Sequence, residues 1–512
     1  VFFRRGCAIV NSEKWSETET TEREILQEMK YQNIIENMTL KEKAAFLSGN
    51  SEWQTREFPR LDIPAIFCSD GPNGVRKQAG AGDPLGINPS VQATCFPTAA
   101  TMANSWDDEL EQKVGVALGE ESMEEEVNVL LGPGLTIKRN PLCGRNFEYF
   151  SEDPYLSGKM AAAFIRGVQS TGAAACAKHF AVNSQELRRM AMNAVVDERT
   201  LREIYLTGFE IAIKEGGAKT VMSSYNEVNG VYANENEHLL KDILRDEWGF
   251  EGSVITDWGA SNDHSLGVKN GSTLEMPTPG LDAARELLAS VESGKISEKD
   301  IDERVDELLD LVLTTTENAK HYKKVADKKA LHEEHHKLAR LACENSAVLL
   351  KNEDGILPVG AKVQAAIIGD FAFDPRYQGA GSSMVNSTKV DSIKDMLETS
   401  GISVTGIVRG YQRDGKEDEA MKKEAVDLAR RSDVVLFFFG LNEKSETEGL
   451  DRKHLRIPQN QINLIQELAK ANANMVGIIS AGSVIEMPWH NHFKALLHTA
   501  LMGPAGAGPV LD

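Results

Sequence analysis

The stretch Val254-Ile255-Thr256-Asp257-Trp258 joins a short apolar run to an acidic and an aromatic residue. A run of this length, rich in β-branched residues, predicts a buried β-strand that ends at Thr256. The Asp257 carboxylate then projects from the carboxyl end of that strand, with the flat Trp258 ring beside it. Taken alone, the pattern also fits an aspartate that caps a following helix, so the rest of the chain has to distinguish the two interpretations.

Similar apolar runs recur through the first 315 residues and are separated by segments with helical periodicity. That periodicity is clear over residues 198–215, where Leu201, Ile204 and Phe209 lie near helical spacing. The predicted strands are residues 64–68, 127–131, 173–178, 220–224, 253–256 and 273–276. Repeated β/α units over about 300 residues predict an α/β fold with a TIM-barrel-like (β/α)8 domain over residues 1–315.

A second alternation follows a polar segment. Residues 316–345 are charged and helix-prone, which predicts a linker and an entry helix, with His332, His335 and His336 on a solvated face. Beyond it, predicted strands at 363–368, 403–408, 434–439 and 475–480 are separated by helical segments 391–400, 417–431 and 459–472. The order predicts a doubly wound α/β sandwich domain over residues 346–512, with 434–439 as a central strand that is apolar on both faces.

Composition narrows the functional classes. The chain has 512 residues with 77 acidic against 56 basic residues, a net charge of -21, which argues against nucleic-acid binding. No stretch approaches the ~20 apolar residues that span a bilayer. The cysteines, which show no paired spacing, are Cys7, Cys68, Cys95, Cys143, Cys176 and Cys343. We therefore expect no disulfide framework, no metal site and no cofactor. No intact signal peptide precedes the domain, which leaves the compartment open between cytoplasmic and secreted.

Polar residues follow the ends of several predicted barrel strands. Asp70 follows the first run, Lys178-His179 closes another and Tyr225 follows a third. TIM barrels build their active sites at this edge, although each motif alone also fits a structural role, such as a turn at Gly-Pro-Asn-Gly. Chemistry at the anomeric carbon of a sugar needs one carboxylate for the carbon and a second acid for the leaving oxygen. Neighbouring cations keep the first carboxylate ionised because positive charge lowers its pKa.

The segments, taken together and in order, resemble glycoside hydrolase family 3 over nearly the whole chain. The matching stretches are SDGPNGVR (69–76), GRNFEYFSEDP (144–154), KHFAVN (178–183), MSSYN (222–226), VITDW (254–258), LEMP (274–277), SAVLLKN (346–352) and EGLDRKHLRIP (448–458). The resemblance implies a retaining, exo-acting β-glucosidase that removes terminal β-D-glucosyl residues through a covalent intermediate. A β-xylosidase, another β-glycosidase of the family and a non-catalytic sugar-binding protein are the alternatives. The branch that removes N-acetylglucosamine fits less well, because residues 181–185 lack that branch's Asp-His pair.

The resemblance also implies individual roles. Asp257 matches the nucleophile, and Trp258 its neighbour in the glycone pocket. Glu448 is the best match for an acid/base from the second domain, with Glu446 as its alternative. The other residues that match substrate-binding positions are Asp70, Arg76, Arg145, Lys178, His179, Arg189, Tyr225, Ser382 and Ser383.

Two expectations follow for the acid/base. A retaining pair stands roughly 5–5.5 Å apart, whereas Asp257 and Glu448 are 191 residues apart in the sequence. We therefore expect docking of the second domain on the barrel to form the site. For Glu448 to act as an acid near neutral pH, we expect apolar closure, or Glu446 and Asp451, to raise its pKa.

The end of the chain and the partners are predicted in the same way. Residues 503–512 resemble a stretch inside the family's second domain, so we expect that domain to be incomplete, with further strands beyond Asp512. The expected partners are a small-molecule or oligosaccharide β-glucoside, without nucleic acid or membrane. We further expect either a homo-oligomer or association with a missing C-terminal segment.

Overall fold

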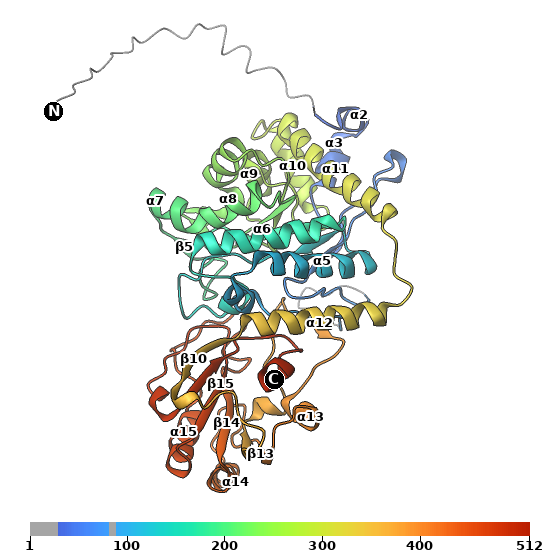
Figure 1. Ribbon diagram of the computed structural model, residues 1–512. Helices are drawn as coiled ribbons and strands as arrows, with labels where there is room; N and C mark the ends of the chain where they lie inside the picture. The colour runs from blue at the N-terminus through green and yellow to red at the C-terminus, as the bar shows by residue number, and fades with distance from the viewer. Residues whose placement is uncertain (1–28, 81–88) are drawn as a thin grey trace, which may run out of the picture.

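The computed structural model describes residues 29–80 and 89–512. A barrel and a separate open sheet lie end to end, and helix α12 (Lys328–Ser346) runs along the boundary between them (Figure 1). Cys7 lies outside the described residues, and the other five cysteines are buried and unpaired. The described part of the chain contains no cluster of His, Cys, Asp and Glu suited to a metal ion. None of its helices is long and apolar enough to cross a membrane.

Parallel strands form the wall of the barrel. In hydrogen-bonded order they are β1 (Cys68–Asp70), β3 (Val129–Leu131), β4 (Ala174–Phe180), β6 (Thr220–Ser223) and β9 (Ser253–Thr256). Past β9, single parallel bridges join Ile255 to Leu274 and Glu275 to Ser48. An antiparallel bridge between Gln54 and Phe67 then leads back to β1. The wall confirms the predicted TIM-barrel-like class.

Two details of this wall differ from an ideal barrel. The predicted strand at 273–276 is present in the described residues only as bridges. The closing step at Gln54 and Phe67 is antiparallel, because only about a dozen residues connect the two positions and these hold no crossover helix.

The predicted helix over 198–215 is interrupted after its first turn by a π-helical stretch, Leu201–Leu206.

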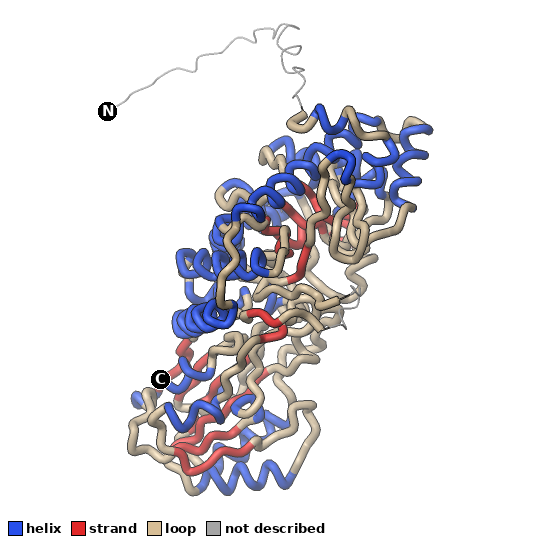
Figure 2. Tube along the Cα trace, turned by 90° about the vertical axis from the view of Figure 1, so that its right-hand side faces the viewer, coloured by secondary structure: helices blue, strands red, loops and turns tan. Residues whose placement is uncertain are grey.

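Helices cover the outside of the barrel (Figures 1 and 2). They are α2 (Gln32–Ile35), α3 (Leu40–Phe46), α4 (Ala99–Met102), α5 (Asp108–Glu124), α6 (Pro154–Ser170), α7 (Glu198–Thr200), α8 (Thr207–Lys214), α9 (His264–Asn270), α10 (Asp282–Glu292) and α11 (Glu298–His321). Helices α5 and α6 pack backbone to backbone: a Cβ atom on Gly167 would lie 2.3 Å from the carbonyl oxygen of Gln112. The remaining short strands are β2 (Gln92–Ala93), which pairs with β12 (Asn386–Ser387), and the three-stranded group β5 (Asn193–Ala194), β7 (Glu227–Val228) and β8 (Val231–Tyr232).

The second domain contains a six-stranded sheet with the order β10-β16-β15-β14-β11-β13. The strands are β10 (Val348–Asn352), β11 (Ala365–Ile368), β13 (Val404–Val408), β14 (Val434–Gly440), β15 (Met475–Ser480) and β16 (Ala495–His498). Its helices are α13 (Ile393–Met396), α14 (Glu419–Arg430), α15 (Gln459–Ala471) and α16 (Ala507–Leu511). All neighbours are parallel except β10, which runs antiparallel to β16. The doubly wound class is confirmed, although strands β10 and β16 were not predicted.

Strand β14 shows why the sheet needs helices on both faces. Val435, Phe437 and Phe439 pack in the core that also contains residues of α14 and α15. The alternate residues, among them Leu436 and Phe438, pack in the opposite core, to which α13 and α16 contribute. Because successive side chains of a strand point to opposite faces, an uninterrupted apolar run is stable only between two helical layers.

The histidines of α12 do not form a solvated face, so that prediction is wrong. His335 is 6% exposed, and its Nδ1 lies 2.7 Å from Glu121 Oε1 while its Nε2 lies 3.0 Å from Glu120 Oε2, both on α5. His336 Nε2 lies 2.7 Å from Asp391 Oδ2 in the second domain. Helical spacing turns these side chains inward, and α12 therefore binds charged residues of both domains.

Replacing His335 with alanine is expected to destabilise the fold by about 3 kcal/mol, since it leaves Glu121 buried with fewer partners. Burial alone lowers the pKa of His335, but its hydrogen bonds to Glu120 and Glu121 outweigh burial and raise the pKa to about 9 from 6.5. The stabilisation from protonated His335 is thus complete below pH 6.5 and is lost as the pH rises through about 9. Urea unfolding at pH 6 and pH 9.5 tests this. The difference in the free energy of unfolding between the native protein and the His335→Ala variant should be smaller at pH 9.5. His321→Ala, at an exposed histidine, should show neither the destabilisation nor its pH dependence.

Candidate active site at the domain boundary

The barrel contributes its polar residues from the carboxyl ends of adjacent strands. Asp70 ends β1, Lys178 and His179 lie near the end of β4, and Tyr225 follows β6 by two residues. Asp257 comes directly after β9, as the apolar run before it predicts. All five residues are buried. Because the strands are parallel neighbours, these side chains meet at one edge of the wall.

Asp257 follows β9, the last of the five hydrogen-bonded strands. Its Oδ1 accepts the backbone N–H of Trp258 at 2.8 Å, which fixes the carboxylate. Its Oδ2 lies 3.5 Å from His179 Nε2 and has no hydrogen-bond partner among the described residues. Burial raises the pKa of Asp257, and the charges of Arg145 and Arg189 oppose that rise. The hydrogen bond to Oδ1 thus holds the Asp257 carboxylate in place, while Oδ2 accepts no hydrogen bond from the described residues.

An aromatic wall stands beside Asp257. The Trp258 ring lies 5.0 Å from the Trp53 ring at an interplanar angle of 36°, and its Nε1 donates to the Glu52 carbonyl at 2.9 Å. The predicted flat apolar surface is thus made of two indoles. Trp53 was not predicted, because its place beside Trp258 depends on the segment that closes the barrel.

Asp70 lies beside two cations. Its Oδ2 lies 3.4 Å from the NH1 of Arg76, which returns to it through the antiparallel bridge between these two residues. Burial raises the pKa of Asp70 to about 6, while the charges of Lys178 and Arg76 lower it. A carboxylate with neighbouring cations suits paired hydrogen bonds to vicinal hydroxyl groups.

A buried ion-pair network supports these cations. Arg145 makes two parallel hydrogen bonds of 2.8 Å to Glu148, and Lys178 Nζ lies 3.5 Å from Glu148 Oε1. Tyr149 Oη lies 3.1 Å from His179 Nδ1 and so orients the imidazole ring. Burial lowers the pKa of His179, and Arg145 and Lys178 add to that effect. Glu148 was not predicted, although its spacing of three residues from Arg145 was a usable signal.

The second domain contributes Glu448 from the loop after β14. Its Oε1 lies 2.7 Å from Arg189 NH1 and 3.6 Å from Arg145 NH1. Its Oε2 accepts the backbone N–H of Ser382 at 2.8 Å. Ser383 is buried next to it, and its hydroxyl has no hydrogen-bond partner in the described chain. Domain docking therefore brings Glu448 to two arginines of the barrel.

The expected rise in the pKa of Glu448 does not occur. Burial favours a rise, but Arg145, Arg189 and the hydrogen bonds from Ser382 outweigh it and hold the pKa well below the usual value. The two carboxylates expected to raise it bind other groups. Glu446 faces Arg376, and Asp451 accepts backbone N–H groups of the barrel. These contacts therefore favour the ionised form of Glu448.

Glu446 and Glu448 do not share a face of their loop. Glu446 is fully buried within the second domain, where its Oε2 lies 3.5 Å from Arg376 NH2. Burial raises its pKa, and Arg376 opposes that effect. Glu448 lies within ion-pair distance of Arg145 and Arg189, whereas Glu446 acts electrostatically on a different barrel cation, Lys138.

A chain of contacts connects the two carboxylates. The Arg189 guanidinium, which binds Glu448, lies 4.6 Å above the Tyr225 ring. The Tyr225 hydroxyl donates to the Trp258 carbonyl at 3.1 Å, one residue from Asp257. The charge of Glu448 also contributes to the raised pKa of Asp257, so the two groups act on each other electrostatically.

Close backbone contacts hold the loop against the barrel. Asp451 Oδ1 accepts the N–H of Gly144 at 3.2 Å and that of Glu186 at 3.0 Å, and its Oδ2 accepts the N–H of Leu187 at 2.9 Å. A Cβ atom on Gly144 would lie 1.8 Å from the carbonyl oxygen of Leu450. Only glycine at residue 144 permits this approach.

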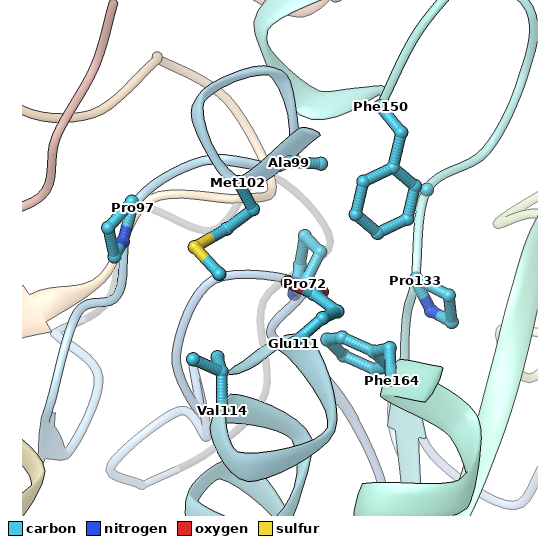
Figure 3. Close-up of a pocket in the computed structure, with 10 residues that line it drawn as sticks. Pro72, Pro97, Ala99, Met102, Glu111, Val114, Pro133, Phe150 and Phe164 are labelled. Atoms are coloured by element: carbon cyan, nitrogen blue, oxygen red, sulfur yellow. The ribbon is translucent and has the colours of Figure 1, made fainter. Parts of the chain in front are cut away.

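A small cavity lies among residues of α4, α5 and α6, and none of the candidate site residues lines it. It measures about 10 Å³, room for about one water molecule, and Pro72, Phe164 and Glu111 line it (Figure 3). Burial raises the pKa of Glu111 to about 8, and its Oε2 has no hydrogen-bond partner among the described residues. The cavity is too small for a sugar ring.

Two carboxylates that act on each other electrostatically amid cations and indoles, at the carboxyl edge of a barrel, are typical of glycoside hydrolases. The chain belongs to glycosyl hydrolase family 3. The model of that family's N-terminal domain matches residues 13–311, and the model of its C-terminal domain matches residues 347–512.

Individual relatives agree with this assignment. The chain is 47% identical over 483 residues to thermostable beta-glucosidase B of Acetivibrio thermocellus, covering 94% of this chain and 63% of that protein. It is 42% identical to an exo-alpha-(1->6)-L-arabinopyranosidase of Bifidobacterium longum, covering 93% and 64%. The crystal structure of a GH3 beta-glucosidase from Bifidobacterium adolescentis superposes with a TM-score of 0.87 at 41% identity, covering 93% and 68%. The chain thus spans somewhat less than two thirds of the length of these curated relatives.

Proposed function

We propose that the protein is a retaining, exo-acting β-glucosidase. The observation that supports the proposal is the chain of contacts from Glu448 of the second domain through Arg189 and Tyr225 to Trp258, the residue after Asp257. A glycosidase with a covalent intermediate needs one carboxylate to attack the anomeric carbon and another to serve the leaving oxygen. The names of two relatives, the beta-glucosidases of Acetivibrio thermocellus and Bifidobacterium adolescentis, support the choice of a β-glucoside.

In the first step, a carboxylate oxygen of Asp257 attacks the anomeric carbon. Oδ2 is suited to this, since it has no hydrogen-bond partner among the described residues, whereas Oδ1 is held by Trp258. The bond from that carbon to the aglycone oxygen breaks, and protonated Glu448 gives its proton to that oxygen. In the second step, Glu448 takes a proton from water while the water oxygen displaces Asp257.

The charge state of Glu448 has a consequence for this cycle. Arg145 and Arg189 stabilise the ionised form, which is the form needed to activate water in the second step. The first step instead draws on the protonated fraction. We therefore expect leaving groups that need a proton to be slower substrates than activated aryl groups, and the more so as the pH rises.

The proposed glycone pocket uses the other residues of the strand edge. Asp70, Arg76, Lys178 and His179 offer charged and polar groups to the hydroxyls of one sugar ring, with the indole of Trp258 on its apolar face. Arg145, Arg189, Tyr225, Ser382 and Ser383 complete the set on the side of Glu448. The partner is a β-glucoside, and either a homo-oligomer or association with a C-terminal segment stays a prediction.

The test is a panel of aryl glycosides with one leaving group: β-glucoside, β-xyloside, α-L-arabinopyranoside and N-acetyl-β-glucosaminide. We expect the β-glucoside to have the highest kcat/KM and NMR to show β-glucose as the first product. A 2-deoxy-2-fluoro-β-glucoside with an activated leaving group should label the peptide that contains Asp257. A preferred arabinopyranoside or xyloside would replace the substrate assignment, and α-glucose as first product would contradict retention.

A further inference from the structure

Glu186 lies on the loop after β4, beside Glu448, and has no role in the mechanism above. It is 3% exposed. Its Oε2 accepts the NH1 of Arg189 at 2.9 Å and the backbone N–H of Gly449 at 2.8 Å. Its own N–H donates to Asp451 at 3.0 Å. Glu186 thus binds Arg189, which also binds Glu448, and two residues that follow Glu448 in the loop of the second domain, Gly449 and Asp451.

One arginine nitrogen serves two carboxylates. NH1 of Arg189 lies 2.9 Å from Glu186 Oε2 and 2.7 Å from Glu448 Oε1. A guanidinium carries one positive charge, so the two carboxylates compete for it, and the charge of Glu448 raises the pKa of Glu186. Glu186 Oε1 is buried with no hydrogen-bond partner in the described residues, which makes its ionised form costly.

Charged and titratable groups face this pair from every neighbouring segment. The barrel provides Asp70, Arg145, Glu148, Lys178, His179, Tyr225 and Asp257, and the second domain provides Asp451 and the N–H of Ser382. Burial raises the pKa of Glu186, opposed by Arg145 and Arg189. Among the carboxylates of this group, Glu186 is the one that shares the NH1 of Arg189 with Glu448.

We propose that Glu186 is a positioning residue that, through Arg189 and Gly449, sets the place of the Glu448 carboxylate and the pH range in which Glu448 carries a proton. This inference rests on the proposed function of Glu448 as the acid/base. In the proposed mechanism, Glu186 itself contacts neither the anomeric carbon nor the leaving oxygen. Its negative charge weakens the hold of Arg189 on ionised Glu448, which keeps a larger fraction of Glu448 protonated.

Glu186→Gln removes that charge and keeps the shape of the side chain. The alkaline limb of kcat/KM reports the pKa of the acid in the free enzyme. Without the competing carboxylate, Arg189 stabilises ionised Glu448 more strongly, so the limb moves to lower pH, by about one unit for charges a few ångströms apart. At a pH above the limb, kcat/KM for an alkyl β-glucoside falls about tenfold. A 2,4-dinitrophenyl β-glucoside changes little, because its leaving group departs without a proton.

The experiment compares pH profiles of kcat/KM on both substrates for four proteins: native, Glu186→Gln, Glu186→Asp and Glu307→Gln. Glu186→Asp keeps the charge but withdraws it from Arg189, so its limb should lie between those of the native protein and Glu186→Gln. Glu307 is a matched control, since it is a little-exposed carboxylate that lies 2.8 Å from both Arg245 and Arg304, away from the site. Its variant is expected to lose stability without moving the limb.

The outcomes separate the inference from the proposed function. A limb that stays in place in both Glu186 variants, or that moves equally in Glu307→Gln, overturns the role of Glu186. If Glu186→Gln does not fold, the smaller shift expected of Glu186→Asp decides alone. If the native protein hydrolyses neither glucoside, the proposed function fails, and the inference fails with it. If the native protein hydrolyses both and only the limb stays fixed, the proposed function stands without this inference.

Discussion

Asp257→Asn is expected to lower kcat on an activated aryl β-glucoside by at least about 10⁴-fold, because the amide cannot form the glycosyl ester. The fold should persist, since the Asn oxygen still accepts the N–H of Trp258 that Asp257 Oδ1 accepts at 2.8 Å. Burial raises the pKa of Asp257, so a neutral amide is no harder to bury there. We therefore expect the midpoint of thermal unfolding to be unchanged or higher. Initial rates and a thermal melt check both statements.

The control for this variant is Asp62→Asn. Asp62 lies in a turn with φ 56°, a left-handed conformation that asparagine also adopts, and it lies outside the site. If Asp62→Asn keeps native activity, the loss of activity in Asp257→Asn is specific to position 257 and is not a general effect of replacing aspartate with asparagine. An Asp257→Asn protein with a rate within tenfold of native would remove Asp257 from the role of nucleophile.

Glu448→Ala is expected to reduce kcat/KM for an alkyl β-glucoside by about 10²–10⁴-fold, the usual contribution of general acid catalysis. For 2,4-dinitrophenyl β-glucoside the first step should be affected far less, so the covalent intermediate accumulates and is then hydrolysed slowly. Azide needs no general base to attack that intermediate. Added azide should restore turnover on the activated substrate and yield β-glucosyl azide.

Glu446→Gln separates the two acidic residues of the loop. Glu446 is fully buried against Arg376, so removing its charge leaves Arg376 with fewer partners and the variant should unfold at lower temperature. It should not distinguish good from poor leaving groups, and azide should have no effect. If Glu446→Gln shows the azide response and Glu448→Ala does not, the two assignments are exchanged.

The strand ends were predictable because a buried strand leaves a strong pattern. The run 253–256 coincides with β9, and the run 475–480 coincides with β15. Polar residues directly after such runs lie at the carboxyl ends of parallel strands, which share one edge of the sheet. Asp70, Lys178 and Asp257 could therefore be predicted to be neighbours from the sequence. Strand β10 left no such signal, because its exposed Leu349 and Leu350 resemble neither a buried nor an alternating strand.

Contacts that depend on domain docking were not predictable from local pattern. Glu186 and Asp451 look like ordinary loop residues, and their significance appears only where Asp451 accepts the N–H groups of Gly144, Glu186 and Leu187. The inward turn of His335 has the same origin, because its partners on α5 lie more than 200 residues away in the sequence. The charge state of Glu448 depends on Arg145 and Arg189, which no spacing in its own loop indicates.

The division of the site between two domains has a consequence for the order of events during synthesis. The barrel, with Asp257, leaves the ribosome first and can fold as a unit. The loop that contains Glu448 follows only after strand β14 has been made. Until that loop docks on Gly144, the nascent barrel has Asp257, the proposed nucleophile, but lacks Glu448, the proposed acid. Newly made chains are therefore expected to remain inactive toward unactivated glucosides until most of the second domain has emerged and folded.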